Sequence, residues 1–196
     1  MKTGLYFGSF NPIHIGHLAI ASYMVEFTDI DQVWFIISPQ NPLKKRHTLL
    51  ADYHRLELVE KAISDDPSLK ASDIEFNLPK PSYTIDTLTY LSEKYSDDHF
   101  ILIMGEDNLH TLPKWKNYDE LLKRYPIYIY PRQGNPSLAS GISKIMEKAM
   151  ITMIDAPRIE ISSSFIRKSI REKKNIRHFL TKEVWEYIDE MNFYRK

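Results

Sequence analysis

Residues 8–18 read Gly-Ser-Phe-Asn-Pro-Ile-His-Ile-Gly-His-Leu, and this stretch decides the fold. It follows an apolar stretch at residues 5–7, which predicts a β-strand, and it precedes a helical pattern over residues 18–27. A strand, a glycine-containing turn and a helix N-terminus turn backbone N–H groups and the positive end of the helix dipole towards an anion. The stretch therefore predicts a phosphate-binding loop in an α/β protein.

Two glycines, a proline and two histidines give this loop its chemistry. Gly8 and Gly16 allow the backbone to approach a phosphate closely, and Pro12 stiffens the chain between them. His14 and His17 lie three residues apart in the first helical turn, so we expect their imidazoles to project from one face. Two imidazoles at an anion-binding helix end suit charge that develops on a phosphate.

The histidine pair alone leaves other interpretations open. Each histidine is compatible with a structural role, and a His-x-x-His pair is compatible with half of a metal site. Zinc proteases, however, use a wider spacing with a glutamate between the histidines. The sequence also has no cysteine that could complete a thiolate site. The whole run, with both glycines, is more specific than the pair and favours phosphate chemistry.

The composition limits the class of protein. A chain of 196 residues suits one domain with a sizeable core, and 43% hydrophobic with 12% aromatic residues is typical of a globular protein. The 26 basic and 26 acidic side chains balance, so no overall field favours a nucleic-acid polymer or an anionic membrane.

The same composition indicates a compartment. The absence of cysteine excludes disulfides and fits a reducing interior. The N-terminus lacks the apolar core of a signal peptide, and no apolar run approaches the ~20 residues that span a bilayer. We therefore expect a cytoplasmic protein without a membrane or nucleic-acid partner. A homo-oligomer is compatible with the sequence, which does not indicate one.

Strand and helix patterns alternate along the rest of the chain. Apolar runs predict strands at residues 33–37, 100–104, 127–130 and 151–154. Helical patterns occupy residues 53–63, 85–95, 118–125, 142–149, 163–172 and 181–191. In the helix over 53–63, the apolar stripe is Leu56, Val59 and Ile63. The alternation predicts one Rossmann-like domain over residues 1–196: a doubly wound parallel sheet with helices on both faces and a C-terminal helical segment, about residues 163–191, packed on it.

This architecture predicts where a ligand binds. Ligands of doubly wound sheets bind beyond the carboxyl ends of the strands, where the strand order reverses. Residues 8–17, 39–45 and 105–107 are therefore expected around one crevice. Residues 131–141, which are rich in Pro, Gly and Ser, predict a surface loop.

A second informative run, Ile-Ser-Ser-Ser-Phe-Ile-Arg, occupies residues 161–167 and begins a helix. Ser163 can cap this helix with its hydroxyl or bond a phosphate oxygen, and Arg167 projects from the same side four residues later. Taken alone, the run is compatible with an ordinary serine-capped helix that carries a solvated arginine.

Together, the two runs resemble the signature of the nucleotidyltransferases that carry a His-x-Gly-His motif, in which both histidines contact the triphosphate of the incoming nucleotide. That superfamily also carries an Ile-Ser-Ser-Thr-x-Ile-Arg element near its C-terminus. Ser164 stands here where threonine is usual, and it keeps the hydroxyl.

Three further segments narrow the resemblance to nicotinate-nucleotide adenylyltransferases. They are Lys-Pro-Ser-Tyr-Thr at residues 80–84, Met-Gly-Glu-Asp at 104–107 and Leu-Pro-Lys-Trp at 112–115. With them, the resemblance extends from residue 8 to residue 194. It implies that Thr84 and Trp115 enclose the pyridine ring of the mononucleotide. A glycine turn, here Gly105 and Asp107, would lie against the adenosine.

Two basic positions are weaker candidates. Residues 41–44, Asn-Pro-Leu-Lys, resemble the family's Asn-Pro-His-Lys, whose lysine approaches phosphate, but Leu43 replaces the histidine. Residues 44–46 are equally compatible with a solvated basic turn. Arg132, which follows the strand predicted at residues 127–130, is a candidate second phosphate contact.

The resemblance implies a reaction and a set of site residues. The reaction is adenylyl transfer from ATP to nicotinate mononucleotide, which gives nicotinate adenine dinucleotide and pyrophosphate, with Mg²⁺ carried in on ATP and no dedicated protein metal site. His14 and His17 would be catalytic. ATP would be bound by Gly8, Ser9, Phe10, Gly16, Lys44, Gly105, Asp107, Ser163 and Arg167. The mononucleotide would be bound by Thr84, Trp115 and Arg132.

Three alternatives remain open. Pantetheine-phosphate adenylyltransferases share the second histidine, but they usually have threonine at the place of His14 and lack the segments that contain Thr84 and Trp115. Cytidylyltransferases share both histidines but carry a different C-terminal signature. A nucleotide-binding sensor without turnover is the third alternative, and an activity assay distinguishes it.

Overall fold

The computed structural model describes residues 1–39, 49–132 and 149–195. The described residues form one sheet of six parallel strands together with six α-helices. The strands are β1 (Lys2–Gly8), β2 (Gln32–Ile37), β3 (Leu69–Ser72), β4 (His99–Gly105), β5 (Ile127–Tyr130) and β6 (Ile151–Met153). The helices are α1 (Ile15–Phe27), α2 (Asp52–Ala62), α3 (Thr84–Lys94), α4 (Tyr118–Arg124), α6 (Ser163–Arg171) and α7 (Lys182–Glu190).

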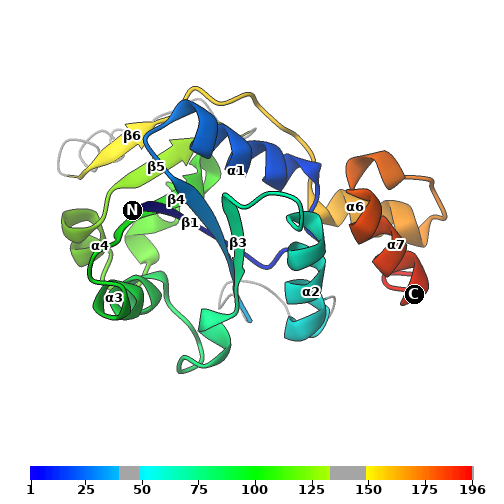
Figure 1. The fold of residues 1–196 in the computed structure, drawn as a ribbon, viewed down its shortest axis with the longest axis horizontal. Coiled ribbons are helices and arrows are strands. Elements are labelled where there is room, and N and C mark those ends of the chain that lie inside the picture. The colour runs from blue at the N-terminus through cyan, green and yellow to red at the C-terminus, as the bar shows by residue number, and fades with distance from the viewer. Residues whose placement is uncertain (40–48, 133–148, 196) are drawn as a thin grey trace.

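The strand order confirms the predicted fold class. The strands follow each other as β3-β2-β1-β4-β5-β6, the order of the doubly wound dinucleotide-binding folds. The order reverses between β1 and β4, which lie side by side at the centre of the sheet (Figure 1). The carboxyl ends of these two strands, at Gly8 and Gly105, therefore flank the position where such sheets bind ligands.

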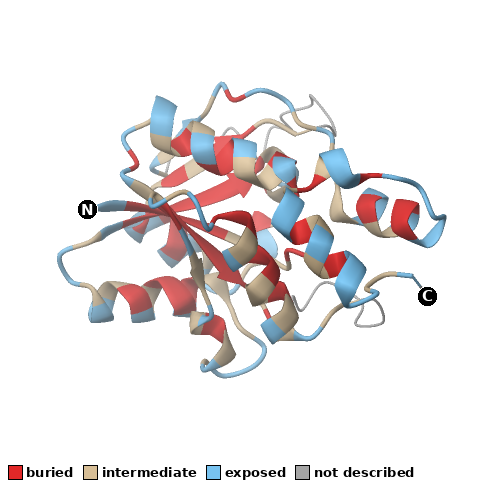
Figure 2. Ribbon diagram, turned by 45° about the vertical axis from the view of Figure 1, so that its right-hand side comes forward, coloured by how far each residue is buried: buried red, intermediate tan, exposed pale blue. Residues whose placement is uncertain are grey.

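The sheet separates two hydrophobic cores because successive side chains of a strand point to opposite faces. Tyr6 and Phe35 belong to a core that α1, α2, α6 and α7 cover. Leu5 and Trp34 belong to the other core, which α3 and α4 cover. The strands are buried almost throughout, whereas the helices are buried only on their inner sides (Figure 2). Both faces of the sheet are thus covered, as predicted.

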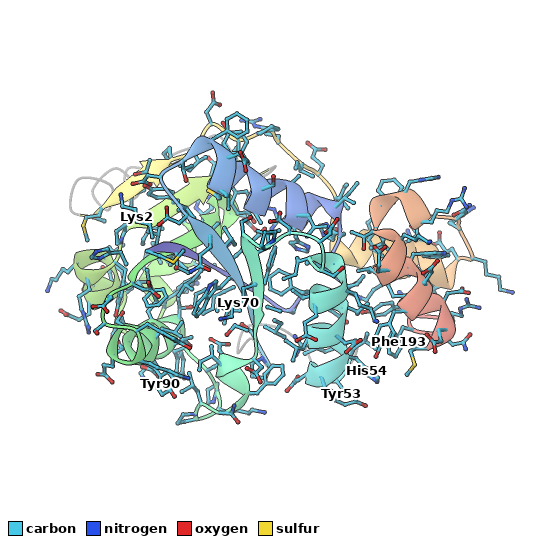
Figure 3. All side chains as sticks on the ribbon, in the orientation of Figure 1. Lys2, Tyr53, His54, Lys70, Tyr90 and Phe193 are labelled. Atoms are coloured by element: carbon cyan, nitrogen blue, oxygen red, sulfur yellow. The ribbon has the colours of Figure 1, made fainter. Side chains whose placement is uncertain are left out.

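The C-terminal helices α6 and α7 lie at one end of the molecule, beside α2 (Figure 1). Phe193, just after α7, meets the His54 ring of α2 at a centroid distance of 4.7 Å, and the two side chains are neighbours in Figure 3. The Nδ1 atom of His54 also bonds the Tyr187 hydroxyl at 3.0 Å. These contacts pack the C-terminal helical segment against the sheet domain.

Helix α1 begins three residues earlier than predicted. His14 has an extended conformation and is the N-cap, and its carbonyl accepts from the backbone N–H of His17 at 2.9 Å. Gly16 therefore lies inside the helix and not in the loop. A Cβ atom there would lie 3.1 Å from the His14 ring, so this glycine makes room for an imidazole. The expectation that it provides loop flexibility was wrong.

Strand β3 was not predicted. Its sequence, Leu-Lys-Ala-Ser, has no apolar run, and the strand lies at an edge of the sheet. The predicted helix over residues 142–149 and the predicted loop over 131–141 lie almost entirely outside the described residues. None of the helices in the part of the chain that the structure describes has the length and apolar character to span a bilayer.

Candidate active site

A depression lies where the carboxyl end of the sheet meets the first turn of α1. Its polar lining includes both motif histidines and an arginine. The lining residues are Tyr6, His14, Gly16, His17, Ile20, Tyr130, Pro131, Arg132, Ile159 and Ile161. The floor contains a hydroxyl pair, Tyr6 and Tyr130, whose oxygens are 2.9 Å apart. Burial raises the pKa of both phenols, so they stay neutral at physiological pH.

The two histidines project together, as predicted. Their rings stack with a centroid distance of 3.8 Å and an interplanar angle of 25°. The backbone N–H of His14 donates to Nδ1 of His17 at 3.3 Å. Since Nδ1 accepts, the proton of a neutral His17 ring must be on Nε2. This contact makes Nε2 of His17 a hydrogen-bond donor.

His14 is the more deeply placed of the pair. Its side chain is only 4% exposed, and Nδ1 has no hydrogen-bond partner among the described residues. Burial, assisted by the positive charge of Arg132, lowers the pKa of His14 to about 4. The imidazole is therefore neutral at pH 7. An unpartnered buried polar atom costs about 1–3 kcal/mol, which a hydrogen-bonding ligand would recover.

The loop that precedes α1 is held by its carbonyl groups. The Gly8 carbonyl accepts from the backbone N–H of Ser38 at 2.9 Å. The Ser9 carbonyl accepts from Arg55 at 2.7 Å, and the Asn11 carbonyl from Arg167 at 2.7 Å. These donors come from the end of β2, from α2 and from α6.

This pattern orients the amides of the loop. In a planar trans peptide the N–H points opposite to the C=O. The N–H groups of Ser9 and Phe10 therefore point away from Ser38 and Arg55, which hold the preceding carbonyls. A loop whose carbonyl oxygens face the scaffold presents its N–H groups on the other side, the arrangement expected of an anion-binding loop.

Ser163 and Arg167 lie against this loop. The hydroxyl of Ser163 donates to the Pro12 carbonyl at 2.8 Å, and Arg167 also bonds the Ser164 hydroxyl at 3.2 Å. The N-cap of α6 is Ser162, which accepts from the N–H of Phe165. The expectation that Ser163 could be the cap was wrong, because the helix starts one residue earlier than the cap assignment requires. The structure thus joins the two sequence motifs directly.

Gly105, Asp107 and Arg132 form one group at the end of β4. Arg132 and Asp107 make an ion pair at 3.4 Å, with both side chains partly exposed. A Cβ atom on Gly105 would lie 2.5 Å from the Asp107 carboxylate and 2.7 Å from Arg132. The missing side chain lets the ion pair lie on the backbone. Arg132, expected on the mononucleotide side, lies on the histidine side of the site.

Thr84 and Trp115 are in neighbouring segments outside this depression. Lys116 bonds the Asp86 carboxylate of α3 at 2.7 Å and lies 4.8 Å above the Tyr83 ring. Lys116 thereby links the residue after Trp115 to the first turn of α3, where Thr84 is the first residue. Both side chains are partly exposed.

Two other predicted ATP ligands need a comment. Phe10 is 2% exposed and packs on the rings of Tyr6, His17 and Phe35, so its side chain belongs to the core. Its φ angle of 41° lies in the left-handed region. Lys44 lies outside the described residues.

Sequence reasoning missed Arg55. This side chain is fully buried and donates to five oxygens: the carbonyls of Ser9, Ser38, Pro39 and Leu50 and the carboxylate of Asp52. The burial lowers the pKa of Arg55, and Asp52 opposes that effect. Arg55 precedes the buried residues Leu58, Val59 and Ala62 by three, four and seven positions. The buried stripe of α2 therefore differs from the predicted one, and an arginine at apolar helical spacing is the signal that could have found it.

Known proteins share this arrangement over the whole chain. The model of the cytidylyltransferase-like family matches residues 5–169. A relative from Flavobacterium psychrophilum, named "Probable nicotinate-nucleotide adenylyltransferase", is 54% identical over 196 residues and covers 100% of both chains. The chain belongs to the nicotinate-nucleotide adenylyltransferase family. A Flavobacterium johnsoniae relative with the same name is also 54% identical, with 100% of each chain covered.

Solved structures agree in fold. The nicotinic acid mononucleotide adenylyltransferase of Plasmodium falciparum, complexed with NaAD, has a TM-score of 0.80 at 21% identity and covers 98% of this chain and 97% of its own. As a member of the nicotinate-nucleotide adenylyltransferase family, the chain is a nucleotidyltransferase with a Rossmann-like fold.

The depressed pKa of His14 predicts a pH-dependent stability. The folded-state pKa is about 4 and the ordinary value is 6.5, so the unfolded chain takes up this proton first as the pH falls. The free energy of unfolding should therefore drop by up to about 1.4 kcal/mol per pH unit between pH 6.5 and 4, with no contribution from His14 above that window. Urea unfolding at pH 5 and 7 measures the slope.

His14→Asn should flatten this slope, because it removes the titrating ring. His178→Asn, at an exposed position, is the control and should keep the wild-type slope. Equal slopes for wild type and His14→Asn would contradict the prediction.

Proposed function

We propose that this chain transfers the adenylyl group of ATP to nicotinate mononucleotide, with His14 and His17 as the catalytic residues. The observation that carries the proposal is the stacked histidine pair at the N-terminus of α1, beside Arg132, in a member of this family. The products are nicotinate adenine dinucleotide and pyrophosphate.

The chemistry requires no protein nucleophile. An oxygen of the mononucleotide 5′-phosphate attacks the α-phosphorus of ATP, and the bond from that phosphorus to the β-phosphate bridging oxygen breaks. Catalysis then depends on positioning and on neutralising charge. Nε2–H of His17 and the ring of His14 donate to phosphate oxygens, while Arg132 and the N-terminus of α1 supply positive potential.

Gly8, Ser9, Gly16, Gly105 and Asp107 complete the proposed ATP site, with Ser163 and Arg167 from the second motif. The backbone between Gly8 and Phe10 turns its N–H groups towards the phosphates. The hydrogen bonds from Ser163 and Arg167 to loop carbonyls support a role in holding this loop for ATP. Lys44 stays in the proposed set on the resemblance alone.

Mg²⁺ is the proposed metal. It prefers oxygen ligands and keeps several waters, so ATP phosphates and water suit it better than imidazoles do. The carboxylate of Asp107 is the protein oxygen ligand that fits this group, since it already pairs with the pocket-lining Arg132. When bound, the ion would neutralise charge on the phosphates. A cytoplasmic location belongs to the same proposal and is supported by the cysteine-free sequence.

Thr84 and Trp115 are proposed to bind the pyridine ring. The N–H of Trp115 donates to the Leu112 carbonyl, and its indole N–H to the Thr111 hydroxyl at 3.4 Å, so both are already engaged. The donors for the pyridine carboxylate are therefore the Thr84 hydroxyl and the first amides of α3. The Trp115 ring supplies a stacking surface.

Pyrophosphate release tests the function. With Mg-ATP, we expect release with nicotinate mononucleotide and almost none with phosphopantetheine. Turnover of phosphopantetheine alone would overturn the assignment, and ATP binding without turnover of any mononucleotide would identify a sensor.

The base of the mononucleotide should matter. Nicotinamide presents N–H donors to the donors of this subsite and leaves them unpaired, at about 1–3 kcal/mol for each buried group. We expect kcat/KM to favour nicotinate mononucleotide by at least about tenfold. Thr84→Val should reduce that ratio, whereas Thr89→Val on the same helix should not. Equal kcat/KM values for the two substrates in the wild type would contradict carboxylate recognition.

A further inference from the structure

The segment that follows α7 returns to the nucleotide-binding loop. The Tyr194 hydroxyl donates to Oδ1 of Asn11 at 2.7 Å, across 183 positions of sequence. Asn11 lies in the middle of the loop and is only 3% exposed. The chain reverses to reach it through left-handed residues at Asn192 and Tyr194, with φ angles of 54° and 62°.

Asn11 connects several distant elements. Its Oδ1 also accepts from the backbone N–H of Leu50 at 3.3 Å, and its carbonyl accepts from Arg167 of α6. Tyr194 interacts electrostatically with both Arg55 and Arg167, the two guanidinium groups that hold loop carbonyls. Burial raises the pKa of Tyr194 far above the physiological range, so the phenol remains a donor.

The loop depends on such external contacts. The Asn11–Pro12 peptide has no N–H to donate. Phe10 adopts the left-handed conformation, which is unfavourable for a residue with a side chain. The groups that stabilise this backbone are therefore side chains from other elements, and Tyr194 is the most distant of them in sequence.

We propose that Tyr194 is a positioning residue for ATP: its hydroxyl fixes Asn11 and thereby sets the loop over residues 8–14 that carries the phosphate-binding amides and His14. The proposal rests on the proposed function of this site. Tyr194 does not line the depression, so its effect must pass through Asn11.

Two matched substitutions test it. Tyr194→Phe removes the hydroxyl that bonds the loop. Tyr187→Phe removes a hydroxyl that also makes a hydrogen bond, to His54 at 3.0 Å, in the same C-terminal region but away from the loop. ATP affinity is measured by calorimetry, and the KM values for ATP and for nicotinate mononucleotide by pyrophosphate release.

Tyr194→Phe should weaken ATP binding and raise KM for ATP about fivefold, the loss of one net hydrogen bond, with KM for the mononucleotide unchanged. Tyr187→Phe should leave all three constants unchanged, although both variants lose some melting temperature. A purely structural role for Tyr194 would lower the melting temperature without this split. Equal effects of the two variants on ATP, or no effect of Tyr194→Phe, would overturn the proposal.

A double-mutant cycle tests the route. If Tyr194 acts through Asn11, Asn11→Ala combined with Tyr194→Phe should bind ATP no more weakly than Asn11→Ala alone. Additive losses would overturn the proposed route. The calorimetric measurement needs no turnover, so a failure of the proposed reaction remains distinguishable from a failure of this inference.

Discussion

His17→Ala is expected to lower kcat by roughly 10²–10³-fold, the loss seen when one preorganised donor to a developing charge is removed. The structure gives the reason, because the His14 backbone N–H occupies Nδ1 of His17 and leaves the proton on Nε2. If this donor binds phosphate most strongly in the transition state, kcat should fall more than KM rises. His17, within the first turn of α1, should matter more than His14. Steady-state kinetics with both substrates measures the effect.

His17→Gln is the informative companion variant, since its amide places an N–H near the position of Nε2 and should retain part of the rate. The melting temperature of each variant is the control, because the His17 ring also packs on Phe10 at a centroid distance of 5.1 Å. A His17→Ala protein that melts early but turns over normally when folded would mean that His17 is structural.

Arg55→Met is expected to lower the free energy of unfolding by about 3–5 kcal/mol, because it breaks a buried ion pair from one side. Methionine fills a similar volume but donates nothing to the four carbonyls and the Asp52 carboxylate that Arg55 now satisfies. Urea unfolding without ligands measures the loss.

Arg177→Met is the matched control, because Arg177 is exposed and should change stability by less than about 0.5 kcal/mol. Arg55→Lys keeps the charge but not the planar fork, so it should fall between wild type and Arg55→Met. An Arg55→Met protein as stable as the wild type would show that these hydrogen bonds contribute nothing net.

Much of the fold could be predicted because its strands are buried on both faces. Such strands appear in sequence as continuous apolar runs, and the strand predicted over residues 127–130 matches β5 at both ends. Strand β3 could not be found this way, since an edge strand with Lys, Ala and Ser carries no such run. The start of α1 was displaced because glycine usually marks a loop, whereas Gly16 serves close packing inside a helix.

The site was predictable where residue types carry chemistry and unpredictable where distant segments meet. The stacking of His14 and His17 follows from helical spacing alone. The hydrogen bonds of Arg55 and Tyr194 to the loop do not, because no local pattern links residue 55 or 194 to residues 9 and 11. Buried polar side chains of this kind are visible only once the tertiary structure brings donor and acceptor together.

The distance in sequence between this loop and its donors sets an order of events during synthesis. The loop is among the first residues to leave the ribosome, whereas its hydrogen-bond donors come from residues 55, 163, 167 and 194. Contacts of such long range form late, since the chain between them must be ordered first. The nascent chain can therefore build most of its parallel sheet before its phosphate-binding loop acquires the described conformation. An incomplete chain is thereby kept from engaging ATP through a half-formed site.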